Sequence, residues 1–524
     1  MHRALSIPEI VRQIAGELDP VNKKERQALA RLAATASIFH LEAIHVLWFG
    51  DDEGKTVTMR RLIVGCLPAE VFHIHPEDQV LDMARPVSAS EWTRFHLYAS
   101  RIRKICFENA ESDLHHLIRA LHNTSGQPFL LPNLRHLRWT LPNHRSFFAF
   151  VLSPLLRSLE YDNPRGEMTA DIKSLAKILP RACPLLAHLQ ILGPVFTDTT
   201  AQLLRRLPHL ASVTIGGIRS HEALESIGLD ERLVQVEIRD VDRASMTNIA
   251  ERSPDVRCIF VKARILRLAM DLRAVCRLLR RCSHSRFDHL SFQRPHGYLH
   301  VATLEALFLA LWEGCIESRK TLSKLEIESG YWLVPTRDTI FSPSLQPLLG
   351  FQSITELVLS TSFIALDIDD NLIERMGQVW PRLQVLDLRG GYNLGIVCRV
   401  THRALLSLAT SCAFLTRLAI TFTSTGIGSE DVAQIDTQCA LQKLDVHLSP
   451  FPFDVPISTL AVFFVRLFPL LRKIGSDRVT ESFIDQFEIQ LDHWRLLEME
   501  LITKHSKRLL EPHLDPSPIL KSSE

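Results

Sequence analysis

Several short segments contain residue types that bind phosphate or metal ions in other proteins, but none has the complete pattern. Residues 50–56 (GDDEGKT) have three residues between two glycines where a P-loop needs four, and three carboxylates where phosphate would lie. His73 and His75 alternate and His115 and His116 are adjacent, but neither pair has a third ligand at metal-binding spacing. Residues 367–371 (DIDDN) lack the glycine and distal glutamate of a calcium loop, which favours a helix start instead.

Motifs that indicate catalysis are missing as well. The sequence contains no G-x-S-x-G, no H-E-x-x-H and no Gly-rich dinucleotide fingerprint. We therefore expect no catalytic residue, no metal and no cofactor, and a protein that is not an enzyme. A catalytic site assembled across distant segments is the alternative that sequence spacing leaves open.

Composition bounds the class of protein and its partners. The chain has 524 residues, 46% hydrophobic and 23% charged, which is typical of a globular protein. Its 60 Lys and Arg nearly cancel its 59 Asp and Glu, so no net field attracts nucleic acid or anionic lipid. The longest apolar stretch, residues 457–471, contains Arg466 and is too short for a bilayer. We expect neither a nucleic-acid nor a membrane partner.

Cysteine usage and the N-terminal residues indicate the compartment. The ten cysteines include no CxxC pair, which is typical of reduced core residues. Arg, Glu or Gln interrupts each apolar run among the first 18 residues, so the pattern of a signal peptide is not met. We expect a cytoplasmic or nuclear location.

The elements that would position any functional residue follow a repeat. The motif L-x-x-L-x-[apolar] occurs fourteen times, with successive starts 22 to 35 residues apart. We name each copy by its first residue: Ile102, Leu134, Leu156, Leu186, Leu210, Leu233, Val256, Phe287, Leu322, Ile354, Leu383, Leu415, Leu441 and Leu471. Helical segments such as residues 198–207, 303–312 and 402–411 precede copies of the motif.

This pattern predicts an α/β leucine-rich-repeat solenoid, a curved parallel sheet backed by helices, with an ordinary α/β protein as the alternative. No copy has asparagine at the ninth position of the long consensus. Strand residues between the buried anchors should form a concave surface of interleaved charge, which suits an unknown protein substrate. Such residues, most of them expected to be solvated, are His136, Arg138, Lys324, Glu326, Glu328, Asp387, Arg389, Lys443, Asp445 and His447. The pattern does not identify which of them bind the substrate.

The first 49 residues have no copy of the motif and predict three helices. Ile7, Ile10, Ile14 and Leu18 share one helical face, a second run carries Leu29 and Leu32, and a third carries Phe39, Ala43 and Leu47 beside Trp48. About fifty residues are too few for a stable independent core, so we expect an exposed apolar face. We divide the chain into this module at 1–49, a connector or degenerate first repeat at 50–100, the repeat domain at 101–510 and a loose tail at 511–524.

The segment IPEIVRQIAGEL followed by LARLAATASIFHLEAIHVLW resembles an F-box, with Ile7 in place of the usual leucine before proline. The whole chain resembles the F-box and leucine-rich-repeat proteins abundant in mushroom-forming fungi. This resemblance implies a substrate-receptor subunit that docks on a Skp-type adaptor of a cullin ubiquitin ligase. The residues implied to bind the adaptor are Ile7, Pro8, Glu9, Ile10, Ile14, Leu18, Phe39, Leu47 and Trp48. The alternatives are a helical cap on the solenoid and a non-catalytic scaffold or inhibitor that binds a protein without a ligase.

Overall fold

The computed structural model has two compact units, unit 1 at Met1–Glu251 and unit 2 at Arg252–Glu524. The residues that the structure describes are 7–18, 22–49, 57–74, 81–107, 118–119, 122–123, 129–140, 145–162, 168–193, 198–218, 221–239, 259–293, 300–328, 338–361, 364–390, 398–424, 427, 437–447, 449–475 and 484–510.

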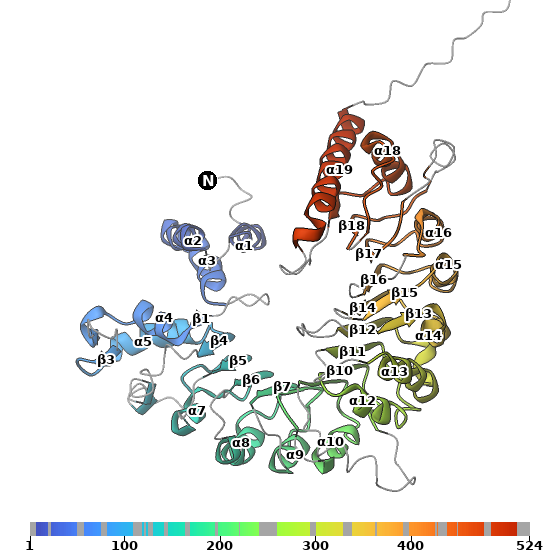
Figure 1. Ribbon diagram of the computed structural model, residues 1–524. Helices are drawn as coiled ribbons and strands as arrows, with labels where there is room; N and C mark the ends of the chain where they lie inside the picture. The colour runs from blue at the N-terminus through green and yellow to red at the C-terminus, as the bar shows by residue number, and fades with distance from the viewer. Residues whose placement is uncertain are drawn as a thin grey trace, which may run out of the picture. The chain divides into compact units, whose positions relative to one another are not determined.

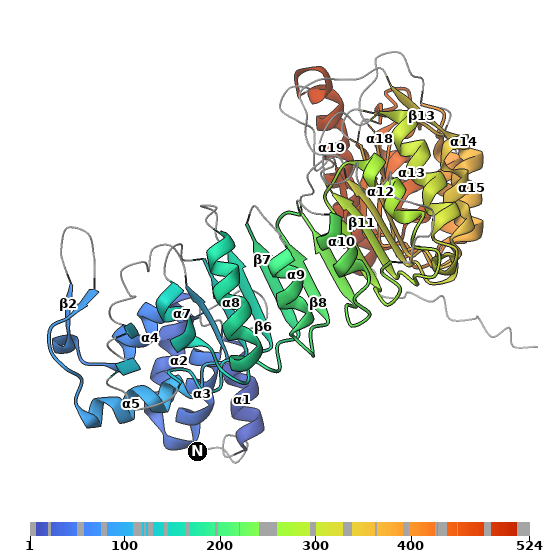
Figure 2. The same cartoon turned by 90° about the horizontal axis from the view of Figure 1, so that it is seen from below.

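Unit 1 contains a three-helix module and a parallel sheet backed by helices. The module consists of α1 (Pro8–Gly16), α2 (Lys23–Thr35) and α3 (Ser37–Phe49). The sheet has the strand order β1-β4-β5-β6-β7-β8-β9, and its helices lie along one side (Figures 1 and 2). The strands are β1 (Val57–Thr58), β4 (Lys104–Phe107), β5 (His136–Trp139), β6 (Ser158–Asp162), β7 (His188–Leu192), β8 (Ser212–Ile215) and β9 (Gln235–Ile238).

The other described elements of unit 1 are one hairpin and the backing helices. The antiparallel pair is β2 (Phe72–Ile74) with β3 (Leu81–Met83). The helices are α4 (Met59–Cys66), η2 (Ala69–Val71), α5 (Ala89–Ala99), α7 (Arg145–Val151), α8 (Met168–Ala182), α9 (Asp198–Arg205) and α10 (His221–Gly228).

Unit 2 repeats the same arrangement, with parallel strands on one side and helices on the other (Figure 1). Its strand order is β10-β11-β12-β14-β16-β17-β18-β19. These strands are β10 (Ile265–Leu268), β11 (His289–Gln293), β12 (Lys324–Glu328), β14 (Glu356–Ser360), β16 (Val385–Arg389), β17 (Arg417–Ile420), β18 (Lys443–Asp445) and β19 (Lys473–Gly475). A second, two-stranded parallel pair is formed by β13 (Thr339–Phe341) and β15 (Ala365–Asp367).

The last of the described helices of unit 2 is a long one. These helices are α12 (Leu272–Leu279), α13 (Val301–Gly314), η4 (Glu317–Lys320), α14 (Ser342–Leu345), η5 (Gln346–Gly350), α15 (Asp370–Val379), α16 (His402–Ser411), α18 (Ile457–Leu467) and α19 (Ile484–Leu510). Trp494 of α19 is buried and donates from Nε1 to the carbonyl of Ser449 at 3.2 Å.

The predicted repeat register is confirmed at thirteen of the fourteen motif copies, because a strand begins two residues after each of their first residues. In β12, for example, Leu325 and Ile327 are fully buried against the helices, while Lys324, Glu326 and Glu328 face the other way. Period-two alternation of this kind is expected of a strand with one face in the core. Both units are therefore built from leucine-rich repeats, as the sequence predicts.

The copy assigned to Val256 is wrong. Val256 itself lies outside the described residues, but Ile259, Phe260 and Val261 follow it without forming a strand. The strand is β10, and its motif begins with Ala263, which is buried. A motif that begins at Val256 and one that begins at Ala263 both give repeat lengths within the observed range. The apolar pattern therefore favoured valine, although alanine is the residue that lies in the core.

Hydrogen bonds from side chains link successive repeats at the turns before β11, β12, β16 and β17. Ser285 Oγ donates to the carbonyl of Ile259 at 2.9 Å, and Ser318 Oγ donates to that of Ser285 at 2.7 Å. Further along, Trp380 Nε1 donates to the carbonyl of Phe351 at 2.7 Å, and Cys412 Sγ donates to the carbonyl of Trp380 at 3.5 Å. Buried carbonyl groups need such partners.

Candidate partner-binding surfaces

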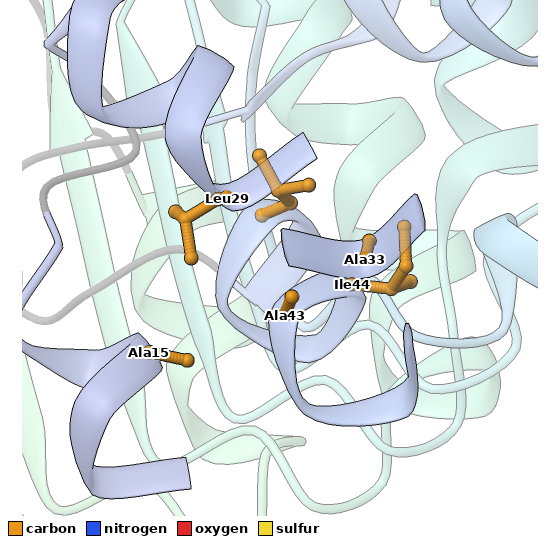
Figure 3. Close-up of a cluster of buried hydrophobic side chains, with 6 residues drawn as sticks. Ala15, Leu29, Ala33, Ala43 and Ile44 are labelled. Atoms are coloured by element: carbon orange, nitrogen blue, oxygen red, sulfur yellow. The ribbon is translucent and has the colours of Figure 1, made fainter. Parts of the chain in front are cut away.

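The three-helix module has a small core that lies between its helices. Ala15 of α1, Leu29 and Ala33 of α2, and Ala43 and Ile44 of α3 point into this space (Figure 3). Two polar contacts support the arrangement: Arg12 pairs with Glu42 at 2.8 Å, and the side chain of Asn22 accepts from the Lys24 amide at 3.0 Å to cap α2. Half of the six residues in this core are alanines.

Helix α1 turns the stripe of Val11 and Ala15 toward this core. Val11 and Ala15 are 1% and 0% exposed, whereas Ile7 and Ile14 are 43% and 45% exposed. Because residues four apart share a helical face, Val11 and Ala15 define the inward stripe. Of the stripe predicted from Ile7, Ile10, Ile14 and Leu18, Ile7 and Ile14 lie on the surface, and Ile10 and Leu18 are half-buried. An exposed apolar face is thus present on α1.

The remaining residues predicted to bind an adaptor have mixed positions. Pro8 and Glu9 are exposed, and Ile10 is half-buried. Leu18 is half-buried against the module core. Phe39 and Leu47 are buried, so in the described structure they are interior residues of the module. Trp48 lies in α3, but its side chain is outside the described part of the structure.

The module also contacts the rest of unit 1. Tyr98 of α5 is partly buried against the module core. Helix α5 is held by a capping box, in which Ser88 Oγ accepts from the Glu91 amide and the Glu91 carboxylate accepts from the Ser88 amide. Arg85 and this capping geometry lower the pKa of Glu91 to about 2. The module is therefore attached to the repeats through α5, while α1 keeps its apolar side chains on the surface.

The strand face of unit 1 carries paired charges. Arg138 on β5 lies 3.2 Å from Glu160 on β6, and Arg239 lies 2.8 Å from Glu237. Partial burial raises the pKa of Asp162 against the opposing effect of nearby arginines. These pairs lie on the face opposite the helices, as predicted for His136 and Arg138.

The strand face of unit 2 holds a first charge network on β11, β12 and β14. Lys324 Nζ lies 2.9 Å from Glu326 and 2.7 Å from Glu356, and His289 Nε2 lies 3.1 Å from Glu326. Burial by itself would raise the pKa of Glu326, but hydrogen bonds from His289 and Lys324 outweigh it and lower this pKa to about 2. Lys324 is thus matched with carboxylates on both sides.

A second network lies on β16, β17 and β18, and here the expectation of solvated side chains is wrong. Asp387, Arg389 and Asp445 are 0%, 5% and 1% exposed. Arg389 Nε donates to Asp387 at 2.7 Å, and its Nη1 lies 3.7 Å from Asp445. Burial opposes the charge of Arg389, but Asp387 outweighs it and raises the arginine pKa. A buried charge is retained when it is paired in this way.

His447 adjoins this network in the left-handed backbone region, with φ of 48°. Its Nδ1 lies 3.1 Å from Thr421 Oγ1, and its amide donates to Asp445 Oδ1 at 2.9 Å. Burial among the surrounding atoms and the charge of Arg389 lower the pKa of His447 to about 4. His447 is therefore neutral at physiological pH.

Sequence reasoning missed three members of these networks. His289, Glu356 and Arg417 occupy the first position of their strands, in register with Lys324 and Lys443. The signal that could have found them was the repeat itself, because each motif places one residue at this position.

The segments considered for phosphate or metal binding have these outcomes. Residues 50–56, His75, His115 and His116 lie outside the described residues, and His73 lies on β2. Asp369 caps α15 by accepting from the Leu372 amide at 3.0 Å, so the predicted helix start is confirmed. Across the described ranges, no group of three or more His, Cys, Asp or Glu could hold a metal ion.

Two other features bear on the environment of the chain. No helix among the described residues is long and apolar enough to cross a membrane. Nine cysteines in the described ranges are free, and eight of these are buried. Burial raises the pKa of Cys412 to about 12, so its thiol stays protonated within the hydrogen-bond series between repeats.

Comparison with known proteins gives distant structural likenesses. No protein-family model matches the chain, and no curated protein matches it. The structure titled a TLR13–ssRNA13 complex has 16% identity and a TM-score of 0.38, over 72% of this chain and 46% of that chain. The Rad7 and Elc1 complex in yeast has 15% identity and a TM-score of 0.32, over 72% of this chain and 86% of that chain. Such values carry no inference about a partner.

Proposed function

We propose that this chain is the substrate-receptor subunit of a Skp-cullin-F-box type ubiquitin ligase. The observation that supports this proposal most is the orientation of α1, which buries Val11 and Ala15 and leaves Ile7 and Ile14 on the surface. A helix that turns Val11 and Ala15 inward and keeps Ile7 and Ile14 on the surface has apolar area for a partner to cover. The resemblance of this segment to an F-box gives that partner as a Skp-type adaptor.

In this proposal the chain performs no bond chemistry. The repeats bind a protein substrate through their strand face, and the module connects that substrate to the cullin ligase. The effect on the reaction is a raised local concentration of substrate lysines near the ligase machinery. Neither a catalytic residue nor a cofactor of this chain is part of the proposal, and its site of action is cytoplasmic or nuclear.

Co-purification of the full chain with a Skp-type adaptor tests this proposal. Ile14→Asp places a charge within the apolar contact and should weaken capture by more than about tenfold, since burying one isoleucine contributes roughly 1.5–3 kcal/mol. Leu309→Asp is the matched control, because Leu309 on α13 is 44% exposed and distant in sequence from the module. The proposal is wrong if the wild-type chain captures no adaptor, or if both variants lose capture equally.

One observation favours the alternative, a repeat scaffold or inhibitor that acts without a ligase. Tyr98 of α5 packs on the module core, as it would if the helices served to cap the repeats. Tyr98→Ala separates these roles. A capping role predicts that this change destabilises the repeats of unit 1, whereas adaptor docking through α1 predicts retained capture.

A further inference from the structure

Helix α12 of unit 2 presents arginines on its outer side. Six of its eight residues are buried, namely Leu272, Ala274, Val275, Cys276, Leu278 and Leu279. The other two, Arg273 and Arg277, are exposed, and the exposed Arg280 follows at the C-cap in helical conformation. Because these three arginines are four and three residues apart, they share one face of the helix. We call this set the arginine face of α12.

The positive charge of this face is mostly unmatched. Within the described ranges, the side chains of Arg273 and Arg277 form neither an ion pair nor a hydrogen bond. Arg280 Nε lies 4.0 Å from a carboxylate oxygen of Glu313 on α13, and both side chains are 52% exposed. An exposed ion pair of this length contributes little. The charge of Arg273 and Arg277 is therefore available to a partner.

Helix stability does not account for this face. Like charges four residues apart destabilise a helix, and a cation in the first turn faces the positive end of the helix dipole. Arg273 lies in the first turn, four residues before Arg277, so it has both disadvantages. By comparison, the exposed residues of α15 mix both signs, as solvated surfaces usually do: Asn371, Glu374, Arg375 and Gln378. The arginine face thus lowers helix stability, which favours a role in binding.

The neighbouring helix α13 adds apolar side chains beside the arginine face. The two helices pack side by side, and the contact between Arg280 and Glu313 joins their outer sides (Figures 1 and 2). Leu309, four residues before Glu313 on the same side of α13, is 44% exposed, and Ile316 just after the helix is 51% exposed. Glu305, one turn earlier on this side, is exposed as well. A partner therefore meets arginines on α12 and both aliphatic groups and carboxylates on α13.

We propose that the outer side of α12 and α13 binds an amphipathic helix of a partner protein, with its acidic stripe on the arginine face and its apolar stripe on Leu309 and Ile316. Along the helix axis, Arg273 and Arg280 are roughly 10.5 Å apart, because each residue rises 1.5 Å. A partner helix alongside α12 has the same rise, so three carboxylates spaced by three and four residues lie opposite the three arginines. This inference goes beyond the proposed function, because it concerns neither the helical module nor the strand face.

An acidic helix fits this surface better than a nucleic acid or an anionic membrane does. A phosphate backbone that crosses from α12 to α13 meets Glu305 and Glu313, which repel it. An anionic membrane carries negative charge over its whole surface and meets the same carboxylates. A protein helix can instead confine its carboxylates to one stripe and place apolar groups on Leu309. Charge complementarity of this kind selects the partner and its orientation.

Fluorescence anisotropy of the full chain tests this proposal with labelled helical peptides. The first peptide has a glutamate stripe beside a leucine stripe, the second has glutamine in place of glutamate, and the third has serine in place of leucine. At low salt the first peptide should bind at least about fivefold more tightly than the second and about threefold more tightly than the third. Equal binding of the three peptides overturns the proposal.

Variants assign the binding to α12 and α13. Arg273→Glu combined with Arg277→Glu should remove the preference for glutamate over glutamine, and Leu309→Ser should reduce the preference for leucine over serine. Lys177→Glu is the matched control, because Lys177 also lies on the exposed side of a helix, α8 of unit 1. This control should keep both preferences. A glutamate preference that persists in the double variant, or that is lost in the Lys177 variant, contradicts the assignment.

Arg273→Glu alone separates binding from folding. The change places an anion at the positive end of the helix dipole and four residues before Arg277, so the unfolding temperature should stay the same or rise. Binding of the glutamate peptide should nevertheless weaken at least about threefold. A lower unfolding temperature with unchanged binding would give Arg273 a structural role and contradict the proposal.

Other occupants of this surface have their own tests. A single-stranded uridine oligonucleotide and vesicles that contain phosphatidylserine should each bind more weakly than the first peptide. A probe that binds more tightly, and loses this binding in the double arginine variant, overturns the proposal in favour of its own class. Sedimentation of the full chain tests a second copy as the occupant. A dimer that dissociates in the double arginine variant likewise overturns the proposal.

Discussion

The cores of the helical module and of the repeats are filled by side chains of very different size. Three of the six buried residues in the module core are alanines, Ala15, Ala33 and Ala43. The repeats of unit 2 bury Phe292, Phe308 and Trp380 completely. Large side chains contribute roughly 1.5–3 kcal/mol or more each on burial, and alanine contributes far less. The comparison indicates that the repeats hold their own fold, while the module depends on the surfaces that contact it.

The surfaces of the helical module and of the repeats also differ, because the module exposes apolar side chains and the repeats carry charged ones. On the module, α1 exposes Ile7 and Ile14. On the strand face of unit 2, charged residues are gathered into networks, and some are buried. Exposed isoleucines give the module apolar area for association, whereas a face of paired charges can discriminate between partners.

The largest effect should follow from emptying the core of a repeat. Trp380→Ala removes a fully buried side chain and the hydrogen bond from its Nε1 to Phe351. We expect it to lower the free energy of unfolding of unit 2 by about 3–5 kcal/mol. Urea unfolding followed by circular dichroism measures this. A decrease in unfolding free energy below about 1 kcal/mol would mean that the buried Trp380 side chain does not stabilise this repeat.

A smaller and local effect is expected in the module. Leu29→Ala removes the largest contribution of α2 to the module core and should cost about 2–3 kcal/mol. Because the module is marginal, α1 to α3 should become sensitive to protease while the unfolding transition of unit 2 stays unchanged. Limited proteolysis with mass spectrometry checks this. An equal loss of stability in unit 2 would show that the module and unit 2 do not unfold independently.

Acid should weaken unit 2 through His447. The unfolded chain protonates this histidine near pH 6.5, whereas the folded pKa is about 4. Protons therefore favour the unfolded state, and stability falls as the pH drops from 6.5 to 4, by up to roughly 2–3 kcal/mol. Glu326, with its pKa of about 2, adds a further loss between pH 4.5 and 2.

His447→Asn is the control for this pH dependence, because asparagine tolerates the left-handed backbone and does not titrate. Thermal unfolding measured from pH 7.5 to 4.5 should be flatter for this variant than for the wild-type chain. An unchanged slope would assign the acid sensitivity to other groups.

The smallest effect concerns the hydrogen bonds between repeats. Ser318 Oγ donates to the Ser285 carbonyl and accepts from the Phe287 amide at 3.0 Å, so Ser318→Ala leaves two buried groups without this partner. We expect a loss of about 1–2 kcal/mol in unfolding free energy. Ser353→Ala removes an accessible bond to Lys320 and should cost less. If both variants lose the same unfolding free energy, burial does not make the hydrogen bonds between repeats more stabilising.

Much of the repeat fold could be predicted from sequence, because each strand needs two buried aliphatic residues at alternate positions. The copy beginning at Ala263 was missed since alanine satisfies the packing but not the pattern. The series of serine, tryptophan and cysteine donors could not be found by a motif, because chemically different residues perform the same role at the turn.

The candidate surfaces were less predictable. Helical spacing identified the apolar residues of α1 but could not say which stripe faces inward, since Val11 and Ala15 form a stripe as regular as that of Ile7 and Ile14. Likewise, alternation placed Asp387 and Asp445 on the strand face but could not show their burial, which depends on neighbouring strands that are distant in sequence.

Hydrogen–deuterium exchange of the full chain, with and without a Skp-type adaptor, locates the adaptor contact. If the adaptor docks on α1, it slows exchange in α1, including the amides around Ile14, and leaves strands β11 to β18 unchanged. Unaltered exchange throughout α1, or protection confined to the strands, would contradict it.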